Sequence, residues 1–149
     1  MIAFEDLKPG TTLSLPPYEV TAEEIVEFAE QFDPQPFHLD GESEQAAGVG
    51  GLIASGWHTC AMAMRMFCDG YLLDSTSQGA PGVGAVRWLK PVRPGDVLSG
   101  TSTVREARLS RKRPGLGIVH VDHEIVNQRG EAVLVMDNTG MFLSRDAVG

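Results

Sequence analysis

The stretch ASGWHTCAMAMRMFCDGYLL, residues 54–73, decides the fold. Residues 56–72 are apolar nearly all round, and Arg65 and Asp69 are the only charged side chains among them. A helix that is hydrophobic on every face is typical of a buried element. Ser55 fits the N-cap position in front of it. The pattern therefore predicts a long buried helix over 56–72, which the rest of the chain must cover.

Four β-rich runs follow this helix. Pro-Gly and Arg-Gly pairs lie between neighbouring runs, and such pairs are typical of hairpin turns. Because no second long helical pattern lies in this half of the chain, the strands should form an antiparallel sheet rather than βαβ units. The four runs are residues 82–92, 96–109, 116–128 and 131–143. The order predicts an α+β fold in which an antiparallel sheet curls around one long central helix.

The N-terminal part supplies the elements in front of the central helix. Residues 7–20 begin with a Pro-Gly turn and alternate weakly, which indicates a short first strand or an extended lead-in. Thr21 and Glu24 fit a capping box at the start of a second, shorter helix. This helix should end before Pro34, which leaves Asp33 at its C-terminal edge.

Length and composition indicate a single domain over residues 1–149. Hydrophobic residues make up 42% of the chain and charged residues 21%, as in globular proteins. The formal net charge of −8 argues against a nucleic-acid partner. No apolar run approaches the roughly 18 residues of a membrane span, and the N-terminus lacks the basic and apolar regions of a signal peptide. We therefore expect a cytoplasmic protein with no membrane partner.

Both cysteines, Cys60 and Cys68, fall within the predicted central helix. Their separation along a helix corresponds to about 12 Å, which is too far for a disulfide. We expect buried, reduced thiols, in agreement with a reducing compartment.

The segment FDPQPFHLD, residues 32–40, contains the strongest candidates for chemistry. Proline fixes its own φ and disfavours the helical region for the preceding residue, so Pro34 and Pro36 should make this segment a stiff, irregular connector. The segment presents a carboxylate at Asp33 and an imidazole at His38, which can hold a water between them and move its protons. In the alternative interpretation Asp33 caps a turn and His38 is structural.

Gly56, at the start of the predicted central helix, adds a third component. The N–H groups of a first helical turn have no partner within the helix, and the missing side chain lets a ligand oxygen approach. A base, an acid and an oxyanion donor are what chemistry at a carbon conjugated to a carbonyl requires. Asp33, His38 and Gly56 are therefore the predicted catalytic set.

The other three histidines give weaker signals. His58 lies near the positive end of the central helix, which disfavours a protonated imidazole. It is either a core histidine with a satisfied hydrogen bond or a lining residue of the same site. His120 and His123 lie an odd number of residues apart on a predicted strand, so they should point to opposite faces rather than share a metal. No CxxC or HExxH spacing is present, and no metal site is predicted.

Positive charge is concentrated in one short stretch. The basic cluster consists of Arg105, Arg108, Arg111, Lys112 and Arg113. Two interpretations are open: a solvated hairpin tip, or a local anchor for an anionic ligand on an otherwise acidic protein.

Three stretches together resemble the MaoC-like dehydratase family of hot-dog proteins, which includes the (R)-specific enoyl-CoA hydratases. They are FDPQPFHLD (32–40), GLIASGWHTCAMAMR (51–65) and KPVRPGDVL (90–98). The resemblance runs over nearly the whole chain. It implies a long central helix wrapped by an antiparallel sheet, in dimers whose sheets join, and hence a homodimer or a multiple of dimers.

The resemblance also implies a function. The chain would be an acyl-CoA hydratase or dehydratase that adds water reversibly to a trans-2-enoyl-CoA. Asp33 and His38 match the catalytic pair, and Gly56 matches the glycine whose N–H faces the thioester oxygen. Neither a metal nor a redox cofactor is implied, because coenzyme A enters as part of the acyl-CoA substrate.

The sequence departs from the family pattern near the acyl pocket. Family hydratases commonly have Asn where Gln35 stands, an aliphatic residue where Phe37 stands, and His-Gly rather than Ser-Gly at the helix start. We expect the arginines of the basic cluster to meet the phosphates of coenzyme A. The residues expected to bind substrate are Phe37, Ser55, Trp57, His58 and Arg111.

Two rival functions stay open. A hot-dog thioesterase would use a carboxylate to drive water at the thioester carbonyl, and the Asp-x-x-Pro-x-His loop argues against it. A non-catalytic acyl-CoA-binding subunit would keep the fold but would need no Asp/His pair, whereas here the pair is intact.

Overall fold

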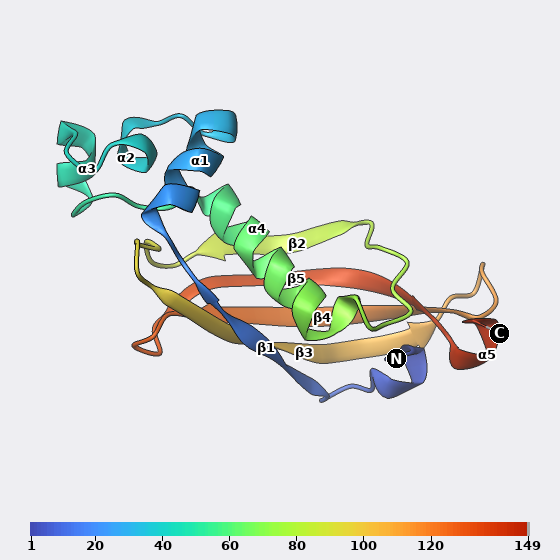
Figure 1. The fold of residues 1–149 in the computed structure, drawn as a ribbon. Helices are drawn as coiled ribbons and strands as arrows, with labels where there is room; N and C mark the ends of the chain where they lie inside the picture. Colours follow the sequence, from blue (N-terminus) through green and yellow to red (C-terminus); the bar gives the residue numbers. More distant parts are fainter. Residues whose placement is uncertain (149) are drawn as a thin grey trace.

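The fold is built on a five-stranded antiparallel sheet, and the central helix lies across one face of this sheet (Figure 1). The computed structural model describes residues 1–148. The strand order is β1-β3-β4-β5-β2, and every neighbouring pair is antiparallel. The strands are β1 (Thr12–Glu19), β2 (Gly82–Trp88), β3 (Val97–Leu109), β4 (Leu116–Val126) and β5 (Ala132–Leu143). The α+β class and the antiparallel sheet predicted from the sequence are confirmed. The hairpin expected between the runs 82–92 and 96–109 is wrong, because β2 pairs with β5 and not with β3.

The central helix is α4 (Gly56–Phe67), and it continues as one π-helical turn, η2 (Cys68–Leu72). Its buried face contacts the sheet through side chains such as Met62 and Met66. The prediction of burial on every face is wrong, because Trp57 is 63% exposed and Met64 48% exposed. One sheet can cover only one side of a helix, so the opposite apolar side faces outward in a single chain.

Strand β4 shows how the sheet separates its two faces. Val119, Val121, His123 and Ile125 are buried against the central helix. The side chains between them point to the outer face, as the alternation of a strand requires. His120 is one of these, so the prediction that His120 and His123 lie on opposite faces is confirmed.

Three further helices gather beyond the N-terminal end of α4 (Figure 1). They are α1 (Ala22–Phe32), α2 (Pro36–Leu39) and α3 (Glu44–Gly48). Two short elements near the chain ends are η1 (Phe4–Asp6) and α5 (Arg145–Val148). The α1–α3 unit lies at one end of the sheet, and η1 and α5 lie at the other.

The start of α1 forms only half of the predicted capping box. The Thr21 hydroxyl accepts a hydrogen bond from the Glu24 N–H at 3.2 Å. The Glu24 carboxylate does not reach back to the N-cap, because it accepts hydrogen bonds from Tyr18 and His58 instead. This carboxylate therefore joins α1 to β1 and α4.

The two cysteines are free, as predicted, but both are half-buried rather than buried. They lie toward the side of the helical segment that the sheet leaves open. Burial raises the pKa of the Cys60 thiol, with a smaller opposing effect of the Trp88 side chain. In the described part of the chain, no helix has the length and apolar character needed to cross a membrane.

Candidate active site

The segment between α1 and α3 brings the predicted pair together. Asp33 is the C-cap of α1, with φ −152° and ψ 69°, and Gln35 is extended. Pro36 then begins α2 as its first residue, a position that suits proline. The expected irregular connector is therefore wrong for residues 36–39, which form a helical turn. This turn places His38 Nε2 3.3 Å from Asp33 Oδ2.

His38 is fixed in one orientation. Its Nδ1–H donates to the carbonyl oxygen of Ile53 at 2.7 Å, and its ring stacks on Phe37 at 4.4 Å between centroids. The side chain is buried, with 5% exposed. Because Nδ1 carries the hydrogen, neutral His38 directs the lone pair of Nε2 at the Asp33 carboxylate.

Asp33 is held as a carboxylate by hydrogen bonds. The Ser55 hydroxyl donates to Oδ2 at 2.6 Å and the Gln35 side chain donates to Oδ1 at 2.7 Å. The hydrogen bond from Ser55 is the main cause that lowers the pKa of Asp33; Gln35 and His38 add to it, whereas burial opposes it. Asp33 is therefore ionised at neutral pH.

Ser55 does not act as its sequence position suggested. It occupies the N-cap position of α4, but its hydroxyl makes no capping hydrogen bond to that helix. As an N-cap its oxygen would accept a hydrogen bond from a backbone N–H of the first turn. Here the hydroxyl instead donates to the Asp33 carboxylate, a charged acceptor that needs donors because it is partly buried. Ser55 is fully buried and touches the catalytic candidates rather than open solvent.

Gly56 lies under the ring of Trp88. A Cβ at Gly56 would lie 2.6 Å from an atom of that ring, so only glycine fits. Trp88 Nε1–H donates to the Gly56 carbonyl oxygen at 2.8 Å and fixes the contact. The Gly56 N–H starts α4 and makes no backbone hydrogen bond within residues 1–148. It is therefore available to an oxygen of a ligand.

A pocket of about 290 Å³ opens beside these groups. One wall contains His38, Gly56 and Thr59, and the other is the β2–β3 connection. That connection contributes Trp88, Leu89, Lys90, Pro91 and Val92. The sequence predicted His38 and Gly56 of the first wall as site residues but not Thr59, and it did not predict Trp88 or Lys90. The only signal for them was that Lys90 begins one of the stretches, KPVRPGDVL, that carry the family resemblance.

His58 does not join the pocket. Its Nε2 lies 3.3 Å from Glu24 Oε1 and its ring stacks on Phe28, so it faces α1 across a separate pocket. Two residues along a helix turn a side chain through about 200°, which points His58 away from Gly56. Burial lowers its pKa, partly offset by Glu24. Its Nδ1 is buried and has no partner in the described structure.

Three other predicted substrate contacts lie outside the pocket lining. Phe37 packs on the ring of His38. Trp57 lies on the outward side of α4 and meets Trp88 edge to face, with 5.3 Å between ring centroids. Arg111 is exposed in the turn between β3 and β4, at the opposite end of the sheet from α1–α3 (Figure 1). Within one chain, the basic cluster therefore does not reach this pocket.

The structure offers no metal centre among residues 1–148, where no three His, Cys, Asp or Glu side chains are grouped to hold an ion. His120 Nε2 lies 3.0 Å from Asp137 Oδ2 on the outer face of the sheet. His123 lies inside, between Ser102 Oγ and Asn138 Oδ1, each at 2.7 Å. Both histidines are engaged by protein groups.

Comparison with known proteins identifies the family of the chain. The family model for the MaoC like domain matches residues 5–127. The uncharacterized protein YdeM of Bacillus subtilis is 32% identical over 112 residues, which are 74% of this chain and 77% of that protein.

Solved structures extend the comparison to the whole fold. The crystal structure of a MaoC-like dehydratase from Rhodospirillum rubrum has 37% identity and a TM-score of 0.84, covering 97% of this chain and 99% of that one. The R-hydratase PhaJ1 from Pseudomonas aeruginosa has a TM-score of 0.75 at 22% identity, covering 97% and 87%, and shares the fold. The family model spans most of the chain, and the chain therefore belongs to the MaoC-like domain family.

Proposed function

We propose that the chain is a hydro-lyase that adds water reversibly to a trans-2-enoyl-CoA and gives the (R)-3-hydroxyacyl-CoA. The observation that carries this proposal is the contact between the partly buried Asp33 and the buried His38, 3.3 Å apart, where His38 and Gly56 line one pocket. A MaoC-like dehydratase and an R-hydratase among the similar structures support the reaction class. The R configuration rests on the R-hydratase and on the family resemblance.

The pair is arranged to hold water. Neutral His38 has its hydrogen on Nδ1, so Nε2 and Asp33 Oδ2 are two acceptors facing each other across 3.3 Å. A water that donates one hydrogen to each acceptor satisfies both. Its oxygen lone pair is then directed at the β-carbon of a substrate in the pocket.

The two groups have different roles. The lowered pKa of Asp33 makes it a weak base, so His38 takes the proton as the water oxygen bonds to the β-carbon. The Asp33 carboxylate stabilises the imidazolium that results. His38 then returns this proton to the α-carbon, so that the elements of one water are added across the double bond. Dehydration follows the same steps in reverse.

Gly56 supplies the third function. Its N–H, at the positive end of α4, stabilises the enolate-like oxygen that develops on the thioester. Removing such a donor costs about 3–4 kcal/mol of transition-state stabilisation in other enzymes. Proton transfers and one hydrogen bond complete this reaction scheme, so it includes neither a metal nor a redox cofactor.

The proposal includes assembly as a homodimer or a multiple of dimers. Strand β2 is an unpaired edge of the sheet, and Val83 and Trp88 on it are exposed next to Trp57 and Met64 of α4. An open edge beside apolar side chains is a site for pairing with a second copy. Sedimentation equilibrium at micromolar concentration should show a dimer or larger. A stable monomer would contradict this part of the proposal.

The reaction class is tested with a short trans-2-enoyl-CoA. We expect the ultraviolet absorbance of the conjugated thioester to fall while a thiol reagent detects no free coenzyme A, because the thioester stays intact. Thiol release equal to substrate loss would show a thioesterase. No change with enoyl-CoA substrates of short, medium and long chain would favour a binding subunit and would contradict the proposal.

A further inference from the structure

The pocket is too small for a whole acyl-CoA. Its volume of about 290 Å³ is at the lower end of the range for drug-sized ligands. It can therefore hold the thioester and part of the acyl chain, but the nucleotide handle and its phosphates must lie at the rim or beyond it. The charges around the rim then decide from which side an anionic handle can approach.

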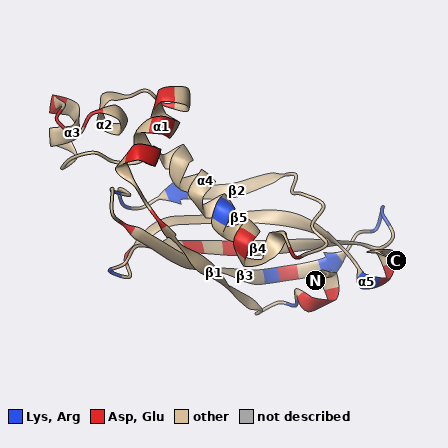
Figure 2. Ribbon diagram, viewed as in Figure 1, with Lys and Arg blue, Asp and Glu red and all other residues tan. Residues whose placement is uncertain are grey.

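The two sides of the rim differ in charge. Figure 2 shows acidic residues on α1 and α3. The acidic residues in and between these helices, none of which is among the residues that line the pocket, are Glu23, Glu24, Glu27, Glu30, Asp33, Asp40, Glu42 and Glu44. Phosphates are repelled on this side. The β2–β3 connection on the other side contributes Lys90 to the pocket lining, the one Lys or Arg among the residues that line it in the described structure.

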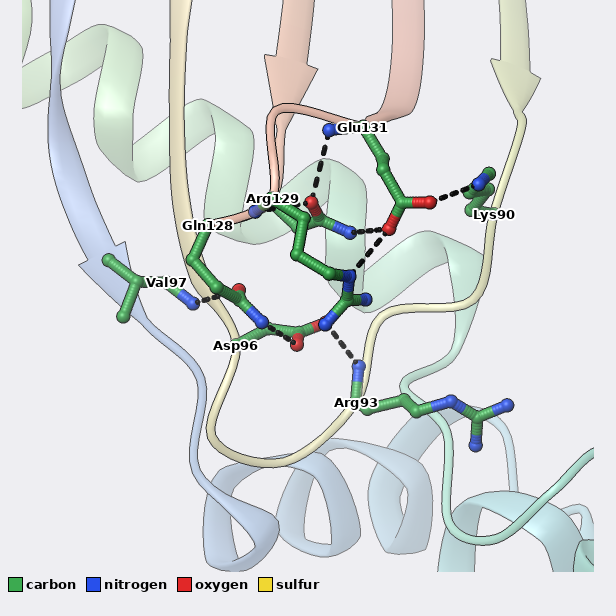
Figure 3. Close-up of polar contacts among 8 residues, drawn as sticks. Lys90, Arg93, Asp96, Val97, Gln128, Arg129 and Glu131 are labelled. Carbon is green, nitrogen blue, oxygen red and sulfur yellow. Dashed lines mark hydrogen bonds and ion pairs between the residues drawn. The ribbon is translucent and has the colours of Figure 1, made fainter.

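Lys90 is held in place without being buried. Its side chain is 51% exposed, and its Nζ forms an ion pair with Glu131 at the β4–β5 turn. Figure 3 shows this contact beside the polar network of the two turns. An ion pair at this exposure contributes little to stability, because water and salt screen it. The lysine can therefore leave Glu131 for another anion at little cost.

Glu131 remains satisfied when Lys90 leaves. Asn127 Nδ2 donates to Glu131 Oε1 at 3.0 Å, and Arg129 Nε donates to the same oxygen at 2.7 Å (Figure 3). The hydrogen bonds from Lys90, Arg129 and Asn127, in that order, lower the pKa of Glu131 to about 2. Two of the three donors do not depend on Lys90, so Glu131 keeps its own anchors during the exchange.

We propose that Lys90 binds a phosphate of the coenzyme A handle, in exchange for Glu131, and so favours CoA thioesters over uncharged thioesters. This inference deepens the proposed function and rests on it. The sequence had suggested that the basic cluster meets the phosphates of coenzyme A. That cluster, which includes Arg111, lies at the other end of the sheet, so we assign this role to Lys90 at the pocket. In this proposal the β2–β3 connection contributes affinity for the substrate, and the opposite wall of the pocket contributes the catalytic groups.

The test compares two substrates with the same acyl group: a trans-2-enoyl-CoA and the corresponding N-acetylcysteamine thioester, which has no phosphate. We expect Lys90→Met to raise KM for the CoA substrate about tenfold, the effect of one charge-assisted contact, and to leave kcat unchanged. Kinetic constants for the cysteamine thioester should not change. Lys90→Arg should restore most of the affinity for the CoA substrate.

Lys112 provides the matched control, because it is an exposed lysine in the β3–β4 turn. Lys112→Met should match the wild type with both substrates. Equal changes with the two substrates in Lys90→Met, or no change with either, would overturn the inference. An effect of Lys112→Met on the CoA substrate equal to that of Lys90→Met would also overturn it.

A binding measurement separates this inference from the proposed reaction. Titration calorimetry with free coenzyme A should show about tenfold weaker binding to Lys90→Met than to the wild type. If the wild type hydrates neither thioester, the proposed function fails, whereas the calorimetry still decides the role of Lys90. Equal binding of coenzyme A to both proteins, or no binding to the wild type, would overturn the inference.

Discussion

His38 and His123 occupy similar surroundings and differ in one respect. They are 5% and 4% exposed, and each ring stacks on a phenylalanine, with centroids 4.4 Å apart at His38 and 4.2 Å apart at His123. Each has a partner at both ring nitrogens. His123 accepts from Ser102 and donates to Asn138, both of them neutral. His38 donates to a backbone carbonyl and faces the ionised Asp33.

The difference shows what burial alone cannot provide. Burial lowers the pKa of His123 more than its neighbours raise it, so the ring stays neutral and serves as a packed polar link. A proton carrier needs a partner that stabilises its charged form. At His38 the Asp33 carboxylate is that partner, and a pocket lies beside the pair. Both histidines are buried and both line a pocket, but only His38 has a charged partner at a ring nitrogen.

The largest expected effect on activity comes from replacing the Asp33 carboxylate. Asp33→Asn keeps the size of the side chain but removes the charge that stabilises an imidazolium at His38. We expect kcat for hydration to fall by ~10²-fold or more, while the thermal unfolding temperature changes little. Turnover close to the wild-type value would contradict the claim that His38, unlike His123, works in catalysis through a charged partner.

Replacing His123 should lower the stability of the fold rather than the catalytic rate. His123→Ala leaves the Ser102 hydroxyl and the Asn138 carboxamide without their partner inside the protein. The free energy of unfolding at pH 7, measured with urea, should fall by about 1–3 kcal/mol, the cost of buried unsatisfied groups. Turnover per folded molecule should be retained. A loss of turnover as large as that of Asp33→Asn would contradict the structural role.

Replacing Ser55 should have a smaller effect on activity, because its side chain contacts Asp33 and not His38. Its hydrogen bond is the main cause that lowers the pKa of Asp33, so Ser55→Ala should raise that pKa. The carboxyl pKa of Asp33, followed by NMR in the two proteins, should therefore be higher in Ser55→Ala than in the wild type. We expect kcat/KM at pH 7 to fall roughly tenfold. An equal Asp33 pKa in the two proteins would show that Ser55 does not tune Asp33.

The sequence predicted elements whose cause is local. The apolar run over 56–72 was sufficient to predict the central helix, and the Arg-Gly signal correctly predicted the β4–β5 hairpin. The Pro-Gly signal before β3 predicted a hairpin that does not form, because β2 pairs with the distant β5. Asp33 and His38 were found because both lie in one short segment that two prolines constrain. The outward exposure of α4 was missed, since an apolar run does not show how many of its sides a single sheet can cover.

Contacts between distant segments could not be predicted in the same way. Ser55 bonds Asp33 across 22 residues, and Trp88 bonds Gly56 across 32. Such pairs depend on how α1, α4 and β2 pack together, and no spacing in the sequence records that packing. The sequence could not show where His58 points for a related reason. Its direction depends on how α4 is rotated relative to α1, where Glu24 is its partner.

The smallest expected effect concerns a partly exposed carboxylate, that of Glu131. Its pKa is lowered from 4.5 to about 2, so its contribution to stability is present above pH 4.5 and is lost as the pH falls toward 2. The small difference in unfolding free energy between the wild type and Glu131→Gln should therefore shrink between pH 5 and pH 2.5. A difference that grows over this range would contradict the sign of the shift.

The most direct measurement is turnover of one short trans-2-enoyl-CoA by His38→Gln and by His123→Gln, each corrected for its folded fraction by circular dichroism. The account predicts that His38→Gln loses ~10²-fold or more in kcat, whereas His123→Gln stays close to the wild type. Full turnover by His38→Gln, or an equal loss in the two variants, would contradict the claim that the Asp33–His38 pair carries the chemistry.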